Sequence, residues 1–288
     1  MKHAYCILAH GCPDILKTLV GLLDDPRNDI YLHLDAKADA GAFRGVRPVR
    51  AGFVFVKDRV DVHWGAPSLV RAEMAALSAA SQNGRYAYCH LLSGVDLPLK
   101  SQDYIHAAFA SRTEEFFDIR HDAFNMKALA THTKWRYLFT EHYHDPNPLR
   151  GRMFDLLRRA FLKVQKVTGW ERHFRMPLHK GSAWFSATGA CVDWLLERRD
   201  WMAREFRYVH ASDEIAVPTA FMMSPFAGNV SAMGNMRDIE WRSDGSPYVY
   251  TLSDIDKLQK SHCLFARKFS SDHMDAVHAV EEFVRKSS

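Results

Sequence analysis

The chain has 288 residues, of which 47% are hydrophobic and 25% charged, and its formal net charge is +4. This is enough apolar sequence for one large core, and the mild positive charge comes without a nucleic-acid-binding motif, so we expect no nucleic-acid partner. No apolar run reaches the roughly 18 to 20 residues that cross a bilayer, and His10 and Gly11 interrupt the N-terminal apolar stretch too early for a signal peptide. We therefore expect a cytoplasmic protein.

The first half of the chain alternates short apolar strands with helical patterns. From β-branched and aromatic runs we predict strands, and from apolar residues at helical spacing we predict helices; the strands are 4–9, 30–34, 53–56 and 86–92, and the helices are 15–23 and 68–80. Such alternation gives mostly parallel strands covered on both faces, a Rossmann-like α/β/α sandwich. We expect a single domain over residues 1–288, with a loop at 143–148 between its halves.

Polar residues follow three of the predicted strands. His10 and Gly11 come after the first strand, Asp35 after the second, and the turn Ser93–Asp96 after the fourth. In open α/β sheets, ligands bind beyond the carboxyl ends of the strands. The sequence therefore predicts a nucleotide site that includes His10, Asp35 and Asp96.

The segment 150–175 concentrates positive charge among apolar residues. It holds eight arginines and lysines interleaved with Met, Phe, Leu, Val and Trp, and it predicts an amphipathic basic helix that begins near Leu149 and ends at Gly169. In one interpretation, this helix packs on the body of the protein with a solvated basic face. In the other, it is a peripheral contact with the anionic inner face of the cytoplasmic membrane.

Neither the cysteines nor the histidines indicate a metal site. The five cysteines are odd in number, widely spaced and mostly within apolar runs, which predicts reduced thiols; they are Cys6, Cys12, Cys89, Cys191 and Cys263. The histidines gather between His132 and His179 without an HExxH or CxxC spacing. We expect no metal cofactor.

Two late motifs carry complementary chemistry. Asp213 and Glu214 form a carboxylate pair in a polar turn before an apolar stretch, and Arg267 and Lys268 lie between two phenylalanines. A carboxylate can take the proton of an attacking hydroxyl, and fixed cations can stabilise a departing diphosphate. Each motif also has a simpler interpretation, as an acidic helix start and as solvated surface charge.

Seven blocks, in this order along the chain, resemble the core-2/I-branching family of glycosyltransferases, which includes β-1,6-N-acetylglucosaminyltransferases and protein xylosyltransferases. They are AYCILAH (4–10), IYLHLDAK (30–37), VHWG (62–65), LLSGVDLPLK (91–100), KGSAWF (180–185), SDEIAVPT (212–219) and FARKF (265–269). The resemblance implies a GT-A-type fold over nearly the whole chain. Eukaryotic members have an N-terminal membrane anchor. Because we see no such apolar segment in this sequence, we expect a soluble, bacterial-type member.

The resemblance also implies roles for particular residues. In the family, the aspartate that corresponds to Asp35 contacts the donor nucleotide, and the one that corresponds to Asp96 lies near the donor sugar or diphosphate. Arg267 and Lys268 then hold the diphosphate without a metal, together with an upstream arginine. Arg237 fits that arginine better than Arg242 does, although one sequence does not fix the register.

The acceptor side is predicted from two further segments. Ser182 and Trp184 match the family's acceptor segment, and a tryptophan beside small residues offers a face on which a sugar ring can stack; the simpler interpretation of Trp184 is an ordinary core residue. Lys134 lies where the N-acetylglucosaminyltransferases place basic acceptor-binding residues, but the match in detail is poor there.

We therefore predict an inverting glycosyltransferase with Glu214 as the general base. It transfers N-acetylglucosamine or xylose from a UDP-sugar to a hydroxyl of a glycan or lipid-linked glycan, in surface polysaccharide biosynthesis. Residues 1–145 form the donor-binding half, and 146–288 form the acceptor-binding and catalytic half. One alternative is a non-catalytic nucleotide-sugar-binding relative. Another is a metal-dependent enzyme that uses the pair Asp254 and Asp256, which we interpret instead as the acidic first turn of a helix.

Overall fold

The fold is built on a five-stranded sheet. The computed structural model describes residues 1–142, 147–243 and 245–287, so most of the predicted loop at 143–148 lies outside the described residues. The strand order is β3-β2-β1-β4-β8, and β8 alone is antiparallel to its neighbour. The strands are β1 (His3–Ala9), β2 (Asn28–Leu34), β3 (Gly52–Phe55), β4 (Tyr88–Ser93) and β8 (Ser186–Thr188).

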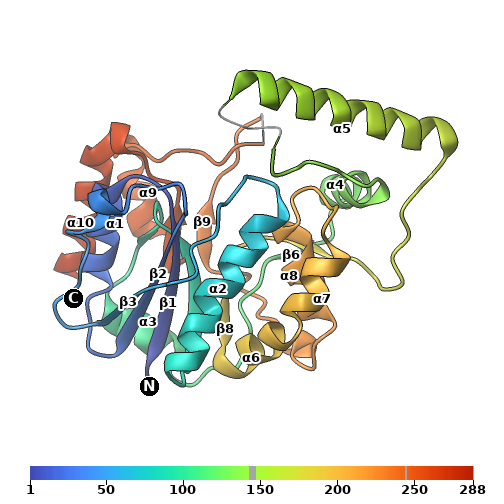
Figure 1. Cartoon of the computed structure of the whole chain (residues 1–288). Helices are drawn as coiled ribbons and strands as arrows, with labels where there is room; N and C mark the ends of the chain where they lie inside the picture. The colour runs from blue at the N-terminus through green and yellow to red at the C-terminus, as the bar shows by residue number, and fades with distance from the viewer. Residues whose placement is uncertain (143–146, 244, 288) are drawn as a thin grey trace.

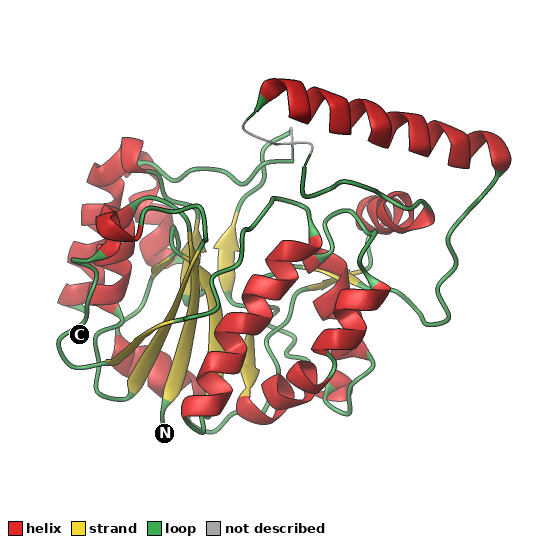
Figure 2. Cartoon of the chain, viewed as in Figure 1, coloured by secondary structure: helices red, strands yellow, loops and turns green. Residues whose placement is uncertain are grey.

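Helices cover both faces of this sheet (Figures 1 and 2), which confirms the predicted α/β/α sandwich with a mostly parallel sheet. One face carries α2 (Pro67–Asn83), α6 (Gly189–Glu197), α7 (Arg199–Glu205) and α8 (Asp213–Met222). The other carries α1 (Pro13–Leu22), α3 (Gln102–Phe109), α9 (Ile255–Lys260) and α10 (Met274–Lys286).

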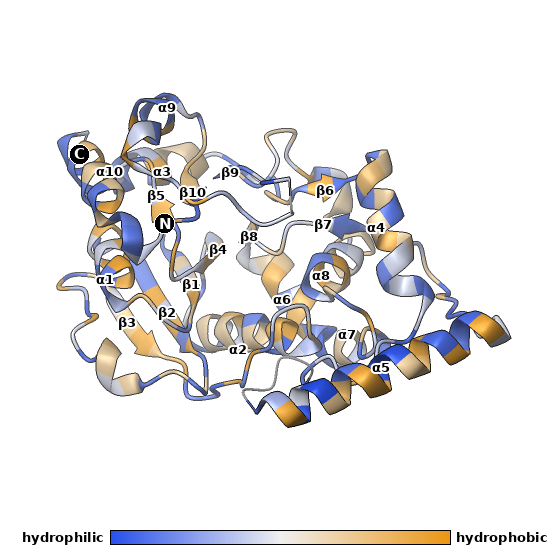
Figure 3. Cartoon of the chain, turned by 90° about the horizontal axis from the view of Figure 1, so that it is seen from above, coloured by the Kyte–Doolittle hydropathy of each residue, from blue (hydrophilic) through white to orange (hydrophobic). Residues whose placement is uncertain are grey.

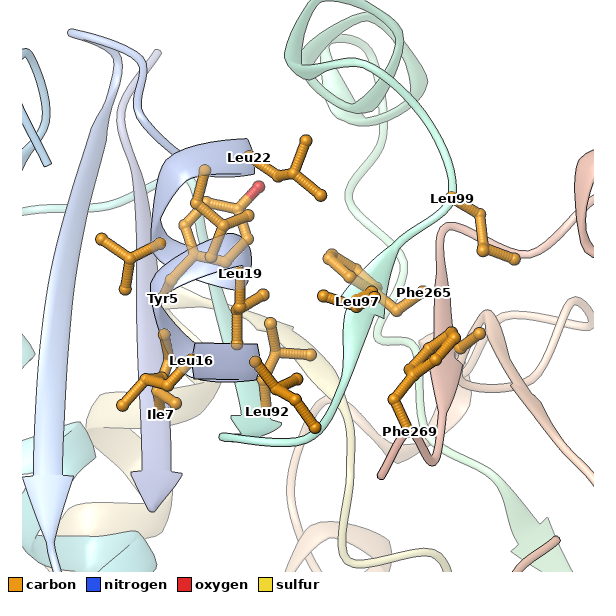
Figure 4. Close-up of a cluster of buried hydrophobic side chains, with 14 of the residues drawn as sticks. Tyr5, Ile7, Leu16, Leu19, Leu22, Leu92, Leu97, Leu99, Phe265 and Phe269 are labelled. Carbon is orange, nitrogen blue, oxygen red and sulfur yellow. The ribbon is translucent and has the colours of Figure 1, made fainter. Parts of the chain in front are cut away.

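The side chains of β1 point alternately to the two faces of the sheet, and each face has its own hydrophobic core. Tyr5 and Ile7 point toward α1, β5 (Leu97–Pro98) and β10 (Phe265–Arg267), where they pack with Leu16, Leu19, Leu97 and Phe265 (Figure 4). Ala4 and Cys6 point the opposite way, into the cluster under α2 and α8. Both sides of the central strand are therefore buried, as parallel sheets require.

Two smaller sheets join distant parts of the chain. One has the order β5-β10-β9, and the other pairs β6 with β7; their strands are β5 (Leu97–Pro98), β9 (Arg237–Ile239), β10 (Phe265–Arg267), β6 (Ile119–Arg120) and β7 (Lys180–Gly181). Because β8 pairs with β4 and β10 with β5, the second half of the chain completes sheets begun by the first. The separate roles of residues 1–145 and 146–288 stay a prediction.

Two helices lie at the margin of the sandwich. These are α4 (Ala123–Lys134) and α5 (Pro148–Thr168), and α5 runs along one edge of the molecule in both views (Figures 1 and 3). The predicted basic helix is thus confirmed, and Gly169 ends it with a left-handed φ of 66°. No helix among the described residues is both long and apolar enough to cross a membrane.

Single turns of 3-10 helix complete the fold, at Ala40–Phe43, Ala227–Asn229, Leu252–Asp254 and Ser271–His273. All five cysteines are free thiols, as predicted, and Cys6, Cys89 and Cys191 are buried.

Candidate active site

The carboxyl ends of β1, β2 and β4 bring His10, Asp35 and Asp96 to one edge of the sheet, as the sequence predicts. The Asp35 N–H donates to the Ala9 carbonyl at 2.9 Å, and the Gly94 N–H donates to the Leu8 carbonyl at 2.8 Å. A Cβ at Gly94 would lie 2.8 Å from that of Ala9. Glycine at this position therefore lets the turn after β4 close against β1.

Asp35 begins a chain of charges along this edge. Its carboxylate accepts the Lys37 N–H at 2.8 Å and pairs with the Lys37 ammonium at 3.2 Å. Lys37 also pairs with Asp61, which contacts the imidazole Nε2 of His63 at 3.0 Å. His10, by contrast, is exposed. The carboxylate of Asp35 is thus held in place and mostly buried, while His10 is open to a ligand.

Asp96 is fully buried and holds Arg267. One carboxylate oxygen accepts the Ser93 N–H, and the other accepts an Arg267 guanidinium N–H, both at 2.8 Å. Burial raises the pKa of Asp96, and the charge of Arg267 opposes this shift. The same guanidinium lies 4.5 Å from the centre of the Trp184 ring. The predicted donor residues Asp96 and Arg267 therefore meet the predicted acceptor residue Trp184.

Among the residues that the structure describes, none pairs with the ammonium of Lys268. Its backbone is fixed on both sides, since its N–H donates to the Tyr248 carbonyl and its carbonyl accepts the Tyr250 N–H. Across the described parts of the chain, no hydrogen bond or ion pair engages its ammonium. An anion could bind there without breaking an existing ion pair.

Arg237 has a different environment from the one predicted for a diphosphate ligand. Its guanidinium is buried and donates to the Ser186 hydroxyl at 2.8 Å, the Phe185 carbonyl at 2.7 Å and the Leu91 carbonyl at 3.3 Å. Burial lowers its pKa to about 9. These bonds fasten β4 and β8 beneath the site. Arg242 is exposed instead and stacks on Tyr248, which contacts Lys268.

Glu214 lies in the first turn of α8 and forms an ion pair with Lys180 of β7. The side chain of Lys180 is 7% exposed and that of Glu214 is 30% exposed. At Gly181, a Cβ would lie 2.4 Å from the Asp118 carbonyl oxygen and 3.1 Å from the Pro218 ring. Glycine therefore lets β7 fit between β6 and α8, which brings Lys180 to Glu214.

Asp213 is the more enclosed of the two adjacent carboxylates. Burial, and then the charge of Glu214, raise the pKa of Asp213 to about 7. Behind it, burial raises the pKa of Glu73 well above the usual range, and the charge of Asp213 adds to this shift. Among the described residues, neither carboxylate oxygen of Glu73 has a hydrogen-bond partner. Of these three acids, Glu214 is the one that is accessible to solvent, whereas Asp213 and Glu73 are buried.

His132 adjoins the ion pair, and sequence reasoning did not identify it or Lys180 as site residues. Burial lowers the pKa of His132; the charge of Lys180 acts in the same direction and that of Glu214 in the opposite one. Lys134, the predicted acceptor residue, instead pairs with Glu171 at 2.8 Å and lies over the Trp135 ring. The sequence did contain a signal that could have identified Lys180, because this residue begins the KGSAWF block that resembles the family.

One short segment connects Glu214 with Arg267. Lys180, which pairs with Glu214, lies at its start, and Trp184, which stacks on Arg267, lies at its end. Four extended residues span at most about 14 Å. Between them the Ser182 hydroxyl accepts the Trp184 N–H at 3.2 Å, so Ser182 shapes this segment. The carboxylate of Glu214 and the guanidinium of Arg267 are therefore linked through the two ends of the same short segment.

Asp254 is occupied as a helix cap. Its carboxylate accepts the N–H and the hydroxyl of Thr251 at 2.8 and 2.9 Å and closes a capping box before α9. Asp256 follows in the first turn of α9. The interpretation of this pair as an acidic helix start is confirmed.

Comparison with known proteins identifies the family of this chain. Residues 3–260 match the Core-2/I-Branching enzyme family. The chain belongs to this family. It is also similar to a bovine (Bos taurus) beta-1,3-galactosyl-O-glycosyl-glycoprotein beta-1,6-N-acetylglucosaminyltransferase, with 22% identity over 98% of this chain and 69% of the bovine protein. The chain is thus a glycosyltransferase of the core-2/I-branching type, with a GT-A-like fold.

Proposed function

We propose that this family member transfers N-acetylglucosamine or xylose from a UDP-sugar to a hydroxyl of a glycan or lipid-linked glycan, with inversion and without a metal. The observation that carries the proposal is the segment 180–184, which contacts the accessible carboxylate of Glu214 through Lys180 and the guanidinium of Arg267 through Trp184. The similarity to an N-acetylglucosaminyltransferase supports N-acetylglucosamine rather than xylose as the sugar.

The reaction is a single displacement. The acceptor hydroxyl gives its proton to the Glu214 carboxylate while its oxygen attacks the anomeric carbon. The bond between that carbon and the β-phosphate oxygen breaks on the opposite face, and its electron pair leaves with UDP. Arg267 and Lys268 stabilise the growing negative charge of the diphosphate. Lys180 stays paired with Glu214 and keeps the carboxylate turned toward the acceptor.

On the donor side, we propose that His10 and Asp35 contact the nucleotide. Asp96 positions Arg267 through its 2.8 Å hydrogen bond. Of the two candidate arginines, Arg242 is exposed and beside Tyr248, whereas Arg237 is enclosed by carbonyls. We therefore place Arg242 ahead of Arg237 as a third diphosphate cation. Trp184 and Ser182 contact the acceptor in this proposal.

Replacement of the base tests this proposal. Glu214→Gln should lower turnover by roughly 10²- to 10⁴-fold, the usual loss for a general base, and leave UDP-sugar affinity nearly unchanged. The measurement is UDP release with a set of UDP-sugars and glycan acceptors, beside calorimetry of UDP binding. Asp213→Asn is the matched comparison and should affect turnover less, because Asp213 is buried behind Glu214.

Two results would contradict the proposal. A larger loss in Asp213→Asn than in Glu214→Gln would move the base to Asp213. UDP binding without UDP release, for every donor and acceptor, would favour the non-catalytic alternative.

A further inference from the structure

Helix α5 carries an apolar stripe on the side that faces solvent. The stripe recurs every three or four residues and consists of Leu149, Met153, Leu156, Ala160, Val164 and Val167. Leu149 is 75% exposed, Leu156 67% and Val167 78%. The two buried residues of α5, Gly151 and Gln165, lie on the opposite side by helical geometry. A helix that is stabilised by packing on a protein body has the reverse pattern.

The opposite side of α5 is fastened to the protein and fixes the direction of the stripe. The Gln165 side-chain oxygen accepts the Arg136 N–H at 2.9 Å, and its amide donates to the Arg136 carbonyl at 3.0 Å. The Phe154 ring packs on Phe139 and His142, with ring centres 5.4 and 4.9 Å apart. The apolar side is therefore directed outward along the edge seen in Figure 3.

The charges beside the stripe are positive. Arg152, Arg159, Lys163 and Lys166 are exposed along one border of it, by helical geometry. The only acid within 148–168 is Asp155, which is half-buried and paired with Arg158 at 2.6 Å and Arg159 at 2.7 Å. A partner for this face must be apolar in its interior and negative at its surface.

We propose that α5 lies on an anionic lipid bilayer, with the stripe in the acyl boundary and the bordering cations among the headgroups. A second copy of this chain fits poorly, because two such faces would oppose like charges. A bilayer supplies apolar and anionic character together. The lipid-binding surface proposed here ends earlier than the predicted segment 150–175, because α5 ends at Thr168.

The contact would hold the catalytic side of the molecule at the membrane. Arg136, which anchors α5, lies four residues after His132. His132 in turn interacts electrostatically with Lys180 and Glu214. An acceptor anchored in lipid would suit this arrangement, a consequence that rests on the proposed function. The lipid contact itself does not, and it can be measured without donor or acceptor.

Sedimentation with vesicles tests the contact. The whole chain should pellet with vesicles of phosphatidylcholine and phosphatidylglycerol, less so at high salt, and should not pellet with phosphatidylcholine alone. Leu156→Glu should weaken binding by about tenfold or more. Arg152→Gln and Lys163→Gln should each weaken it by about fivefold.

The controls place the same changes elsewhere. Val49→Glu changes a 92% exposed valine, and Arg44→Gln changes an exposed arginine; both should bind vesicles as the unchanged chain does. The proposal is overturned if the unchanged chain stays in the supernatant with anionic vesicles. It is also overturned if Leu156→Glu binds these vesicles as strongly as the unchanged chain binds them. A dimer that Leu156→Glu dissociates, without vesicle binding, would assign the stripe to a second copy.

Discussion

Lys180 is more deeply buried than the carboxylate with which it pairs. A buried ammonium that lost its partner would be an uncompensated charge, so the pair is strongly coupled. Glu214 remains partly exposed beside it, and Asp213 and Glu73 are enclosed behind it. Lys180 is therefore a positioning residue, which fixes the carboxylate.

Lys180→Met should lower turnover, because the Glu214 carboxylate loses the ammonium that holds it in place. Lys180→Arg should restore much of the activity, because it keeps a cation at this position. The measurement is the rate of UDP release by each variant under identical conditions. Equal losses in Lys180→Met and Lys180→Arg would contradict this role.

A cluster of buried histidines lies where β1, β4 and α3 meet. His3 Nδ1 and His90 Nε2 are 3.1 Å apart, and the rings of His3 and His106 of α3 are 4.1 Å apart. Burial lowers the pKa of His3 to about 3 and that of His106 to about 4. In the folded chain these imidazoles therefore stay neutral above about pH 4, whereas in the unfolded chain they take up a proton below about pH 6.5.

His106→Gln should reduce the loss of stability in acid. Between pH 6.5 and about 4, the unfolded chain protonates His106 and the folded chain does not, so the free energy of unfolding falls as the pH falls. The variant lacks this contribution. It should be less stable at pH 7, because the 2.9 Å bond to Asn28 is lost, and the difference should shrink by up to ~1.4 kcal/mol per pH unit on acidification.

Urea unfolding at several pH values measures this difference. Comparison with the unchanged chain cancels the buried acids Asp213 and Glu73, whose raised pKa values act in the opposite direction. His262→Gln, at an exposed position, is the control and should leave the pH dependence as it is. A constant difference between His106→Gln and the unchanged chain would mean that His106 takes up its proton at the same pH in the folded and unfolded states.

Across the whole molecule, the sequence predicted what local periodicity determines. The strand expected at 4–9 is β1, His3–Ala9, and the sandwich follows from the regular alternation in the first half. The three-residue strands β8 and β10 were not predicted, because so short a stretch has no periodicity of its own. The same limit applies to the site: Lys180 and Glu214 are separated by 34 residues, and only tertiary structure shows that they pair.

Burial was the other property that the sequence did not reveal. Arg237 and Arg267 are both arginines of short strands, but the first is enclosed by carbonyls and the second lies against Trp184. Nothing in the residues around them distinguishes these two environments. The helical pattern of 150–168 was clear from the sequence, whereas the direction of its apolar side depends on the contacts of Gln165 and Phe154.

The balance of charge over the whole molecule leads to a prediction on metal dependence. Arg267 is already paired with Asp96, while no partner engages Lys268 in the described parts of the chain, so Lys268 has the greater capacity for a new anion. If these side chains replace a divalent cation, UDP binding and transfer should survive excess EDTA.

Lys268→Ala should weaken UDP binding by roughly ten- to a hundredfold, the value of a charge-assisted contact of about 1.5 to 3 kcal/mol. It should slow transfer as well, because the charge opposite Lys268 grows as the glycosidic bond breaks. Calorimetry of UDP binding to both proteins, with EDTA and with manganese, separates the two mechanisms. Binding that appears only with manganese would replace the cationic clamp with a metal-dependent mechanism.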